Sequence, residues 1–133
     1  MNQLPSIIQA VVSTEHLSCV NVLVGSDIFS LLLAEKFESS QLVDKNVNLA
    51  FKETEIILSK ELLTASANSA SAVIKDISRG EVLTQVTLSY QSYEINALVP
   101  TSLFEPLHVS IEDSVYWMVQ ANEISLLWGT NGI

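Results

Sequence analysis

The chain has 133 residues, enough for one ordinary hydrophobic core or two small ones and too few for a multi-lobed protein. Apolar residues make up 48% of the chain, which excludes a disordered protein. Charged residues make up only 16%, which is low for the surface of a free monomer, so we expect an oligomer. The net charge of −9 argues against binding to nucleic acid or to an anionic membrane surface.

The cellular compartment is suggested by what the sequence lacks. The single cysteine, Cys19, cannot close an intrachain disulfide, and its alternating apolar surroundings predict a buried strand. The first residues do not resemble a signal peptide, and no segment reaches the roughly 18 apolar residues that cross a bilayer. We therefore expect a cytoplasmic protein without a membrane partner.

The sequence is internally duplicated. Residues 2–34 match residues 68–100 at a shift of 66, and residues 47–58 match residues 115–126 at a shift of 68. Identical pairs include Asn2/Asn68, Ile8/Ile74, Val47/Val115 and Glu55/Glu123. The change of shift places two extra residues in the second copy, near Phe104 to His108, where a loop accommodates them.

Apolar residues alternate with period two in both copies, which is typical of half-buried strands. In the first copy we predict strands at Ile7 to Val12, Ser18 to Val24, Ile28 to Leu33, Val47 to Phe51 and Glu55 to Ser59. In the second copy we predict strands at Val73 to Ser78, Leu83 to Tyr90, Tyr93 to Val99, Val115 to Val119 and Glu123 to Leu127. Residues 34–40 and 101–107 break the alternation and predict short helical turns.

Five short strands with a brief helix before the fourth are the layout of a small Greek-key barrel. The sequence thus predicts an all-β protein of two tandem five-stranded OB-type barrels, at residues 1–63 and 64–128, with residues 129–133 as a C-terminal tail. The connector, Leu62 to Ser71, could carry a strand from one barrel to the other. Because barrels of about 60 residues are marginal alone, we expect them to pack together and oligomerise.

These features resemble the molbindin or Mop family, also called TOBE. The family's closing pattern, VIKASxVxL, is matched by Phe51 to Leu58, with Lys52 on the family's lysine and Thr54 on its serine. The opening pattern, SARNxxxGxV, is matched by Ala65 to Asn68. Asn2 to Ile8 resembles the opening of the second Mop repeat of molybdate-responsive transcription regulators. The resemblance extends over roughly residues 2–128 and implies the tandem barrel fold.

The chain departs from the family pattern at several positions. Ala67 stands where the family has arginine, and Gln120 replaces the closing lysine in the second copy. The hydroxyls of the family's VTxxS stretch are missing in both copies, where the residues are Ala34, Phe37, Pro100 and Leu103.

The resemblance implies a small oxyanion ligand, molybdate or tungstate, with no organic cofactor and no direct protein ligand to the metal. The pockets would lie between subunits of a homo-oligomer, which the family implies is a trimer. A tetrahedral dianion is best held by backbone N–H groups, hydroxyls, amides and a lysine, away from carboxylates. The candidate donors are Lys52, Thr54, Ser66, Asn68, Gln120 and Asn122. Glu53 would point away from Lys52 if both lay on a strand.

Less specific interpretations remain open at each position. Lys52 could be a solvated lysine at a strand end, and Asn2 and Asn68 could bond to the backbone rather than to a ligand. We expect Trp117 to pack in the core or an interface rather than stack on bases. His16 and His108 lack metal-ligand spacing, and no nucleophile or phosphate loop accompanies them, so nothing favours an enzyme.

Two functions follow from the sequence, and a third is weaker. The first is cytoplasmic binding of molybdate or tungstate for storage, buffering or sensing. The second is a regulatory or oligomerisation module of a transcription regulator or transport ATPase, with a degenerate oxyanion site. An oligonucleotide-binding barrel agrees with the fold alone and is opposed by the charge.

Overall fold

The computed structural model describes residues 1–62 and 67–128, and it is almost entirely β. The strands are β1 (Asn2–Ser13), β2 (Ser18–Val24), β3 (Asp27–Leu33), β4 (Asn46–Phe51), β5 (Ile57–Ser59), β6 (Ala67–Arg79), β7 (Leu83–Tyr90), β8 (Tyr93–Pro100), β9 (Ser114–Gln120) and β10 (Ser125–Trp128). The helices are short: α1 (Ser39–Leu42), α2 (Thr101–Phe104) and the 3-10 turns η1 (Glu53–Glu55), η2 (Glu105–Leu107) and η3 (Ala121–Glu123). The predicted all-β class is confirmed.

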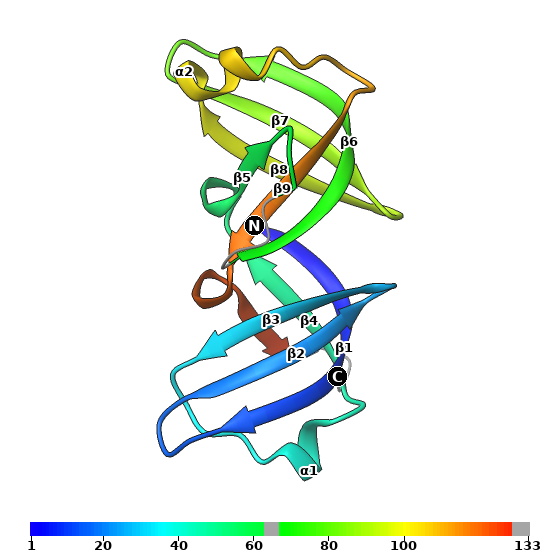
Figure 1. Ribbon diagram of the computed structural model, residues 1–133, viewed down its shortest axis with the longest axis vertical. Helices are drawn as coiled ribbons and strands as arrows, with labels where there is room; N and C mark the ends of the chain where they lie inside the picture. The colour runs from blue at the N-terminus through cyan, green and yellow to red at the C-terminus, as the bar shows by residue number, and fades with distance from the viewer. Residues whose placement is uncertain (63–66, 129–133) are drawn as a thin grey trace. The chain divides into compact units, whose positions relative to one another are not determined.

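The strands form two five-stranded sheets, each of which takes one strand from the other half of the sequence (Figure 1). One sheet has the order β10-β4-β1-β2-β3, and the other has the order β5-β9-β6-β7-β8. The chain accordingly divides into two compact units, one of Met1–Asn2 with Lys52–Val119, and the other of Gln3–Phe51 with the chain from Gln120 onward. The expected division at residue 63 keeps β5 with the first barrel, whereas the structure pairs it with β9.

Each copy thus gives its last strand, β5 or β10, to the sheet of the other copy, and we call this the strand exchange. Comparison of the two sequence copies does not predict it, for a physical reason. The two copies are duplicates, so either β4 or β9 presents an edge that a closing strand can join. The register is Ile57 opposite Met118 for β5, and Leu126 opposite Leu49 for β10. Apolar alternation identifies these segments as strands, but it does not show which sheet they join.

The two sheets share the same irregularities at equivalent positions. A register shift follows Ile8 in β1 and Ile74 in β6, at the sequence shift of 66. The carbonyl oxygen of Ile8 accepts a hydrogen bond from the N–H of Asp44, and that of Ile74 accepts one from Glu112, each at 2.8 Å. Asp44 and Glu112 both have positive φ, 71° and 76°, and they are related by the shift of 68. The two extra residues therefore lie between these points, in the loop with α2 and η2.

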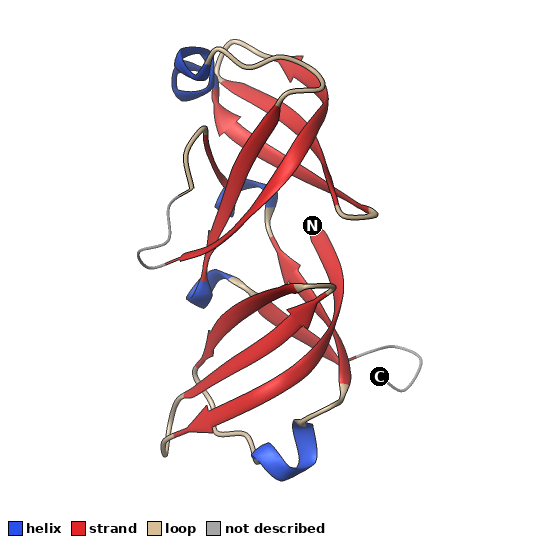
Figure 2. Ribbon diagram, turned by 45° about the vertical axis from the view of Figure 1, so that its right-hand side comes forward, coloured by secondary structure: helices blue, strands red, loops and turns tan. Residues whose placement is uncertain are grey.

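The ends of the predicted strands differ from those observed. The fifth strands begin at Ile57 and Ser125, because the residues before them form the 3-10 turns η1 and η3. Within its own unit, η1 contacts β8 and η3 contacts β3, so each sheet curls until its two edges approach (Figure 2). The first strands begin earlier than predicted, at Asn2 and Ala67.

Cys19 is exposed, which corrects the prediction that it is buried. On β2 the residues that face inward are Ser18, Val20, Val22 and Val24. The sequence of β2 alternates between two faces, but both faces carry apolar residues. Hydrophobicity alone therefore gave no basis for choosing the buried face.

Aromatic residues fill the core of the unit that contains β6 to β9. Trp117 is fully buried and meets the Tyr90 ring in a T-shaped contact, with 5.1 Å between ring centroids. Phe104 of α2 is also buried, and the Arg79 guanidinium lies 5.6 Å from its ring centroid. Trp117 is thus a core residue, as expected. Among the described residues, no helix is long and apolar enough to span a membrane.

The alternation along β7 gives a matched test of this core. Leu88 is completely buried, whereas Leu83 on the same strand is 44% exposed. Leu88→Ala should lower the free energy of unfolding by about 2–5 kcal/mol, because it removes buried methyl groups and leaves a cavity. Leu83→Ala should cost less than about 1 kcal/mol in the same urea titration. Equal losses would mean that β7 has the opposite face inside.

Candidate functional site

Four of the six candidate donors lie on two equivalent turns. Lys52 precedes η1 and Thr54 lies on it, while Gln120 precedes η3 and Asn122 lies on it. The backbone conformations of the two leading residues nearly coincide, with φ −78° and ψ 150° at Lys52 and φ −72° and ψ 148° at Gln120. All four side chains are exposed. Lys52 and Thr54 therefore have the same backbone setting as Gln120 and Asn122, and the two pairs differ in their side-chain chemistry.

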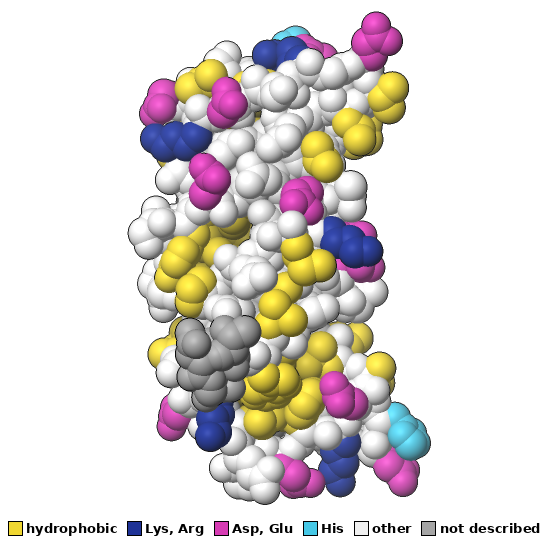
Figure 3. Space-filling view, turned by 180° about the vertical axis from the view of Figure 1, so that it is seen from behind, with side chains coloured by type: hydrophobic (Ala, Val, Ile, Leu, Met, Phe, Trp, Pro, Cys, Tyr) yellow, Lys and Arg dark blue, Asp and Glu magenta, His cyan; other side chains and the backbone are white. Residues whose placement is uncertain are grey.

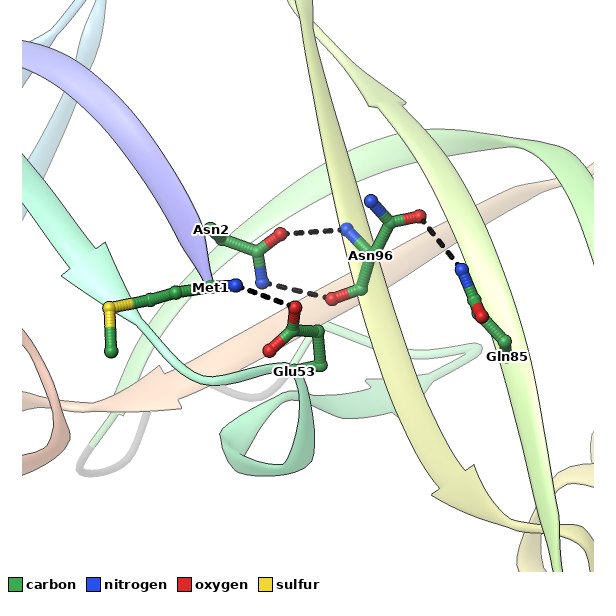
Figure 4. Close-up of polar contacts among 5 residues, drawn as sticks. All are labelled: Met1, Asn2, Glu53, Gln85 and Asn96. Atoms are coloured by element: carbon green, nitrogen blue, oxygen red, sulfur yellow. Dashed lines mark hydrogen bonds and ion pairs between the residues drawn. The ribbon is translucent and has the colours of Figure 1, made fainter.

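The carboxylate of Glu53, which follows Lys52 in the sequence, is paired with the Met1 amino group. Glu53 lies on the 3-10 turn and not on a strand, so the expectation that alternation turns it away from Lys52 does not apply. The Met1 amino group donates a hydrogen bond of 2.8 Å to Glu53 Oε2 (Figure 4). This bond, with a further one from the backbone of Glu53, lowers the pKa of the Glu53 carboxyl group. Within residues 1–62 and 67–128, no carboxylate forms an ion pair with Lys52.

Asn2 has a structural role that favours the backbone-bonding interpretation. It is only 5% exposed, and its Nδ2 donates to the carbonyl oxygen of Asn96 at 2.9 Å. Its Oδ1 accepts from the N–H of Asn96 at 2.8 Å (Figure 4). Asn96 lies on β8, the edge strand of its sheet, so the Asn2 amide satisfies backbone groups that a neighbouring strand would otherwise bond.

The remaining candidates lie at or before the start of β6. Asn68 is half-buried there, and Ser66 lies outside the described residues. The neighbouring Ser69 was not predicted, yet its Oγ is buried without a hydrogen-bond partner in the described part of the chain. The only signal for it in the sequence was the concentration of hydroxyls and amides in residues 66–69. Ser69 follows Asn68 on β6, so its side chain points to the opposite face of the strand.

A cavity of about 200 Å³ lies beside η1, but its chemistry does not suit an anion. Thr54 is on its wall, and the other lining residues are apolar: Ile56, Ile57, Leu58, Leu98, Val99, Pro100, Leu103, Phe104 and Leu107. Leu103 occupies a position where the resemblance would supply a hydroxyl. The exposed Lys52 is not among the residues that line this cavity.

Phe37, another of the positions where the family has a hydroxyl, also lies in apolar surroundings. The Phe37 ring lies 6.1 Å from that of Trp128, measured between centroids. The loop before Phe37 is instead held by Ser18, whose buried Oγ donates to the carbonyl of Glu35 at 2.7 Å and accepts from the N–H of Phe37 at 3.1 Å. Hydroxyl groups near these loops thus serve the fold, and they were not predicted as site residues.

The charged residues that the structure describes outside the turns do not group into a metal site. In the described ranges, no group of three or more histidine, cysteine, aspartate or glutamate residues could hold a metal ion. On the face shown in Figure 3, lysine and arginine side chains lie singly rather than forming a basic surface. That face therefore offers no continuous positive track of the kind that nucleic-acid backbones require.

The fold and the two turns define a class of all-β proteins with two OB-type sheets. No family model matches the sequence, and no curated protein matches it. Among solved structures, the chain is similar to the cytoplasmic molybdate-binding protein ModG in a crystal form with molybdate bound. The TM-score is 0.82 at 20% sequence identity, covering 95% of this chain and 94% of that one. This similarity confirms the predicted OB-type fold.

The role assigned to Asn2 can be tested by substitution. Asn2→Ala should lower the free energy of unfolding by about 1–3 kcal/mol, because two partly buried hydrogen bonds to the β8 backbone are lost. Gln85→Ala is the control, since its amide lies 3.5 Å from Asn96 Oδ1 in an exposed contact and should contribute less than about 0.5 kcal/mol. If urea unfolding gives the same stability for both variants, Asn2 does not hold β8.

Proposed function

We propose that this protein binds molybdate, or the equally tetrahedral dianion tungstate, reversibly and without catalysis in the cytoplasm. The observation that carries the proposal is the similarity to molybdate-bound ModG over nearly the whole of both chains. The exposed Lys52 adds chemical support, since it lies at the position that matches the family's closing lysine and has no carboxylate partner among the described residues.

The proposed donors combine one cation with several neutral groups. Lys52 supplies the charge, and Thr54, Ser66 and Asn68 supply hydroxyl and amide hydrogen bonds. Gln120 and Asn122 supply the corresponding groups of the second copy. Charge-assisted hydrogen bonds to an anion are about twice as strong as neutral ones, so the copy with Lys52 should bind more tightly.

We further propose that the sites form between subunits of a homo-oligomer, a trimer by the resemblance stated above. The opening segment of one barrel would face the closing segment of another across the subunit contact. Reversible binding of this kind suits storage, buffering or sensing of the oxyanion. The low fraction of charged residues, 16%, supports an assembly in which part of the surface is covered.

A second candidate function is a regulatory or oligomerisation module whose oxyanion site has degenerated. It would belong to a transcription regulator or a transport ATPase. The observation in its favour is that Leu103 lines an apolar cavity and Phe37 packs near Trp128, where the resemblance would supply hydroxyls. The two functions differ in whether the purified protein binds the oxyanion.

Calorimetric titration of Lys52→Ala tests the cation directly. A hydrogen bond to a charged group is worth roughly 1.5–3 kcal/mol, so this variant should bind molybdate about ten- to a hundredfold more weakly while remaining folded. Gln120→Ala is the matched control on the equivalent turn and should weaken binding less. Unchanged affinity of Lys52→Ala would remove this lysine from the site.

Thermal unfolding distinguishes the two functions. A ligand that binds only the folded state adds about 2.7 kcal/mol of stability at a hundredfold excess over its dissociation constant. Molybdate and tungstate should therefore raise Tm, and sulfate and phosphate should raise it less. A Tm that does not change in millimolar molybdate would favour the regulatory or oligomerisation module.

A further inference from the structure

The outer face of β1, β2 and β3 is unusually apolar. The strand register brings its outward residues into three rows across the strands, namely Ile7–Leu23–Ile28, Ala10–Asn21–Ser30 and Val12–Cys19–Leu32. We call these nine residues the outer face of β1–β3. Ile7, Val12, Ile28 and Leu32 are 44%, 72%, 56% and 44% exposed. The middle row is polar on two strands, where Ser30 Oγ donates to Asn21 Oδ1 at 2.7 Å.

The second sheet provides an internal comparison, because its register is equivalent. Its corresponding rows are Val73–Ser89–Glu94, Asp76–Thr87–Asn96 and Ser78–Gln85–Leu98. This equivalent face is mostly polar, with Glu94 at the position of Ile28 and Gln85 at the position of Cys19. The fold itself therefore does not require apolar residues on this face.

The distribution of charge differs in the same way. Asp27 is the single charged residue on β1, β2 and β3, whereas β6, β7 and β8 carry Lys75, Asp76, Arg79 and Glu94. Two copies of a chain with net charge −9 repel one another over most of their surfaces. Of the two equivalent faces, the outer face of β1–β3 is therefore the one on which two copies can approach with less repulsion.

The pattern of rows is also self-complementary. In a symmetric pair the two-fold axis lies in the plane of contact. If the axis runs along the strands, each row meets the same row of the second copy. If it runs across the strands, the two apolar rows meet each other and the middle row again meets the middle row. We propose that the outer face of β1–β3 packs against the same face of a second copy of this chain. This contact goes beyond the proposed function and does not depend on oxyanion binding.

The size of the face determines how strong this contact can be. With strands about 4.8 Å apart and alternate residues about 6.7 Å apart, nine side chains cover about 300 Å². A stable interface buries about 800 Å² on each partner, so the face forms the apolar centre of a modest interface. The association is therefore concentration-dependent.

Cys19 makes the test possible in the unmodified protein, because it is the single cysteine and lies on this face. Sedimentation velocity without oxyanion, from about 1 to about 100 micromolar, should show the mass of the assembly doubling. The Cys19 thiol should react at least tenfold more slowly with an aromatic disulfide reagent at the upper concentration. This protection is expected whether or not molybdate binds.

A double variant transfers residues from the second sheet to the first. Leu23→Ser with Ile28→Glu introduces the residue types of Ser89 and Glu94, and it should abolish both the doubling and the protection of Cys19. Val82→Ser is the control, since Val82 is 77% exposed and lies outside the outer face of β1–β3. That variant should behave as the parent does, and urea unfolding checks that both variants fold.

Three results would overturn the proposal. The first is a parent mass that does not depend on concentration, together with rapid reaction of Cys19 throughout, as expected if a different protein covers this face. The second is doubling that persists in the folded double variant. The third is doubling of the parent while Cys19 remains fully reactive, which would place the contact elsewhere. None of these results bears on the oxyanion titration of Lys52→Ala, so the two proposals fail separately.

Discussion

Neither half of this sequence completes a sheet by itself, because the last strand of each half is hydrogen-bonded into the sheet of the other. The exchanged strands are short, three residues in β5 and four in β10. The residues that precede them, Ile56 and Ile124, are only 3% and 2% exposed and anchor each segment in a core. Each exchanged strand and the isoleucine before it belong to the compact unit whose sheet that strand joins. The exchange therefore makes Lys52–Val119 an insertion in the chain between β4 and β10 of the other unit.

The same exchange explains why the four candidate donors on the two turns are exposed. The chain passes from one unit to the other between Phe51 and Lys52, and again between Val119 and Gln120. Phe51 and Val119 are buried, and the residue after each of them is exposed. A 3-10 turn follows at both points, before the exchanged strand begins. The turns thus present side chains that no sheet constrains, where substitution from lysine to glutamine leaves the fold intact.

Sequence reasoning succeeded where a local pattern determines the outcome. Alternation located the strands, and the change of shift located the insertion near α2. It failed where the outcome depends on partners distant in sequence, as in the pairing of β5 with β9. The composition of β2 does not determine which of its faces is buried, so the sequence predicts a buried Cys19 and the structure shows an exposed one. For the candidate site, the motif indicated Lys52 and Thr54, but it could not show that Asn2 is engaged with the backbone of Asn96.

Duplication gave this chain two copies of each position, and the copies have diverged in ways that suit different roles. The lysine before one exchanged strand is a glutamine before the other, although the backbone angles remain within 6° in φ and 2° in ψ. The outer face is apolar on β1–β3 and polar on the equivalent strands, although the register is the same. In both cases the backbone stays constant while the side-chain chemistry changes. Because the backbone is the same in both copies, the fold does not explain why the side chains differ. These two differences are therefore the ones to attribute to oxyanion binding and to association between copies.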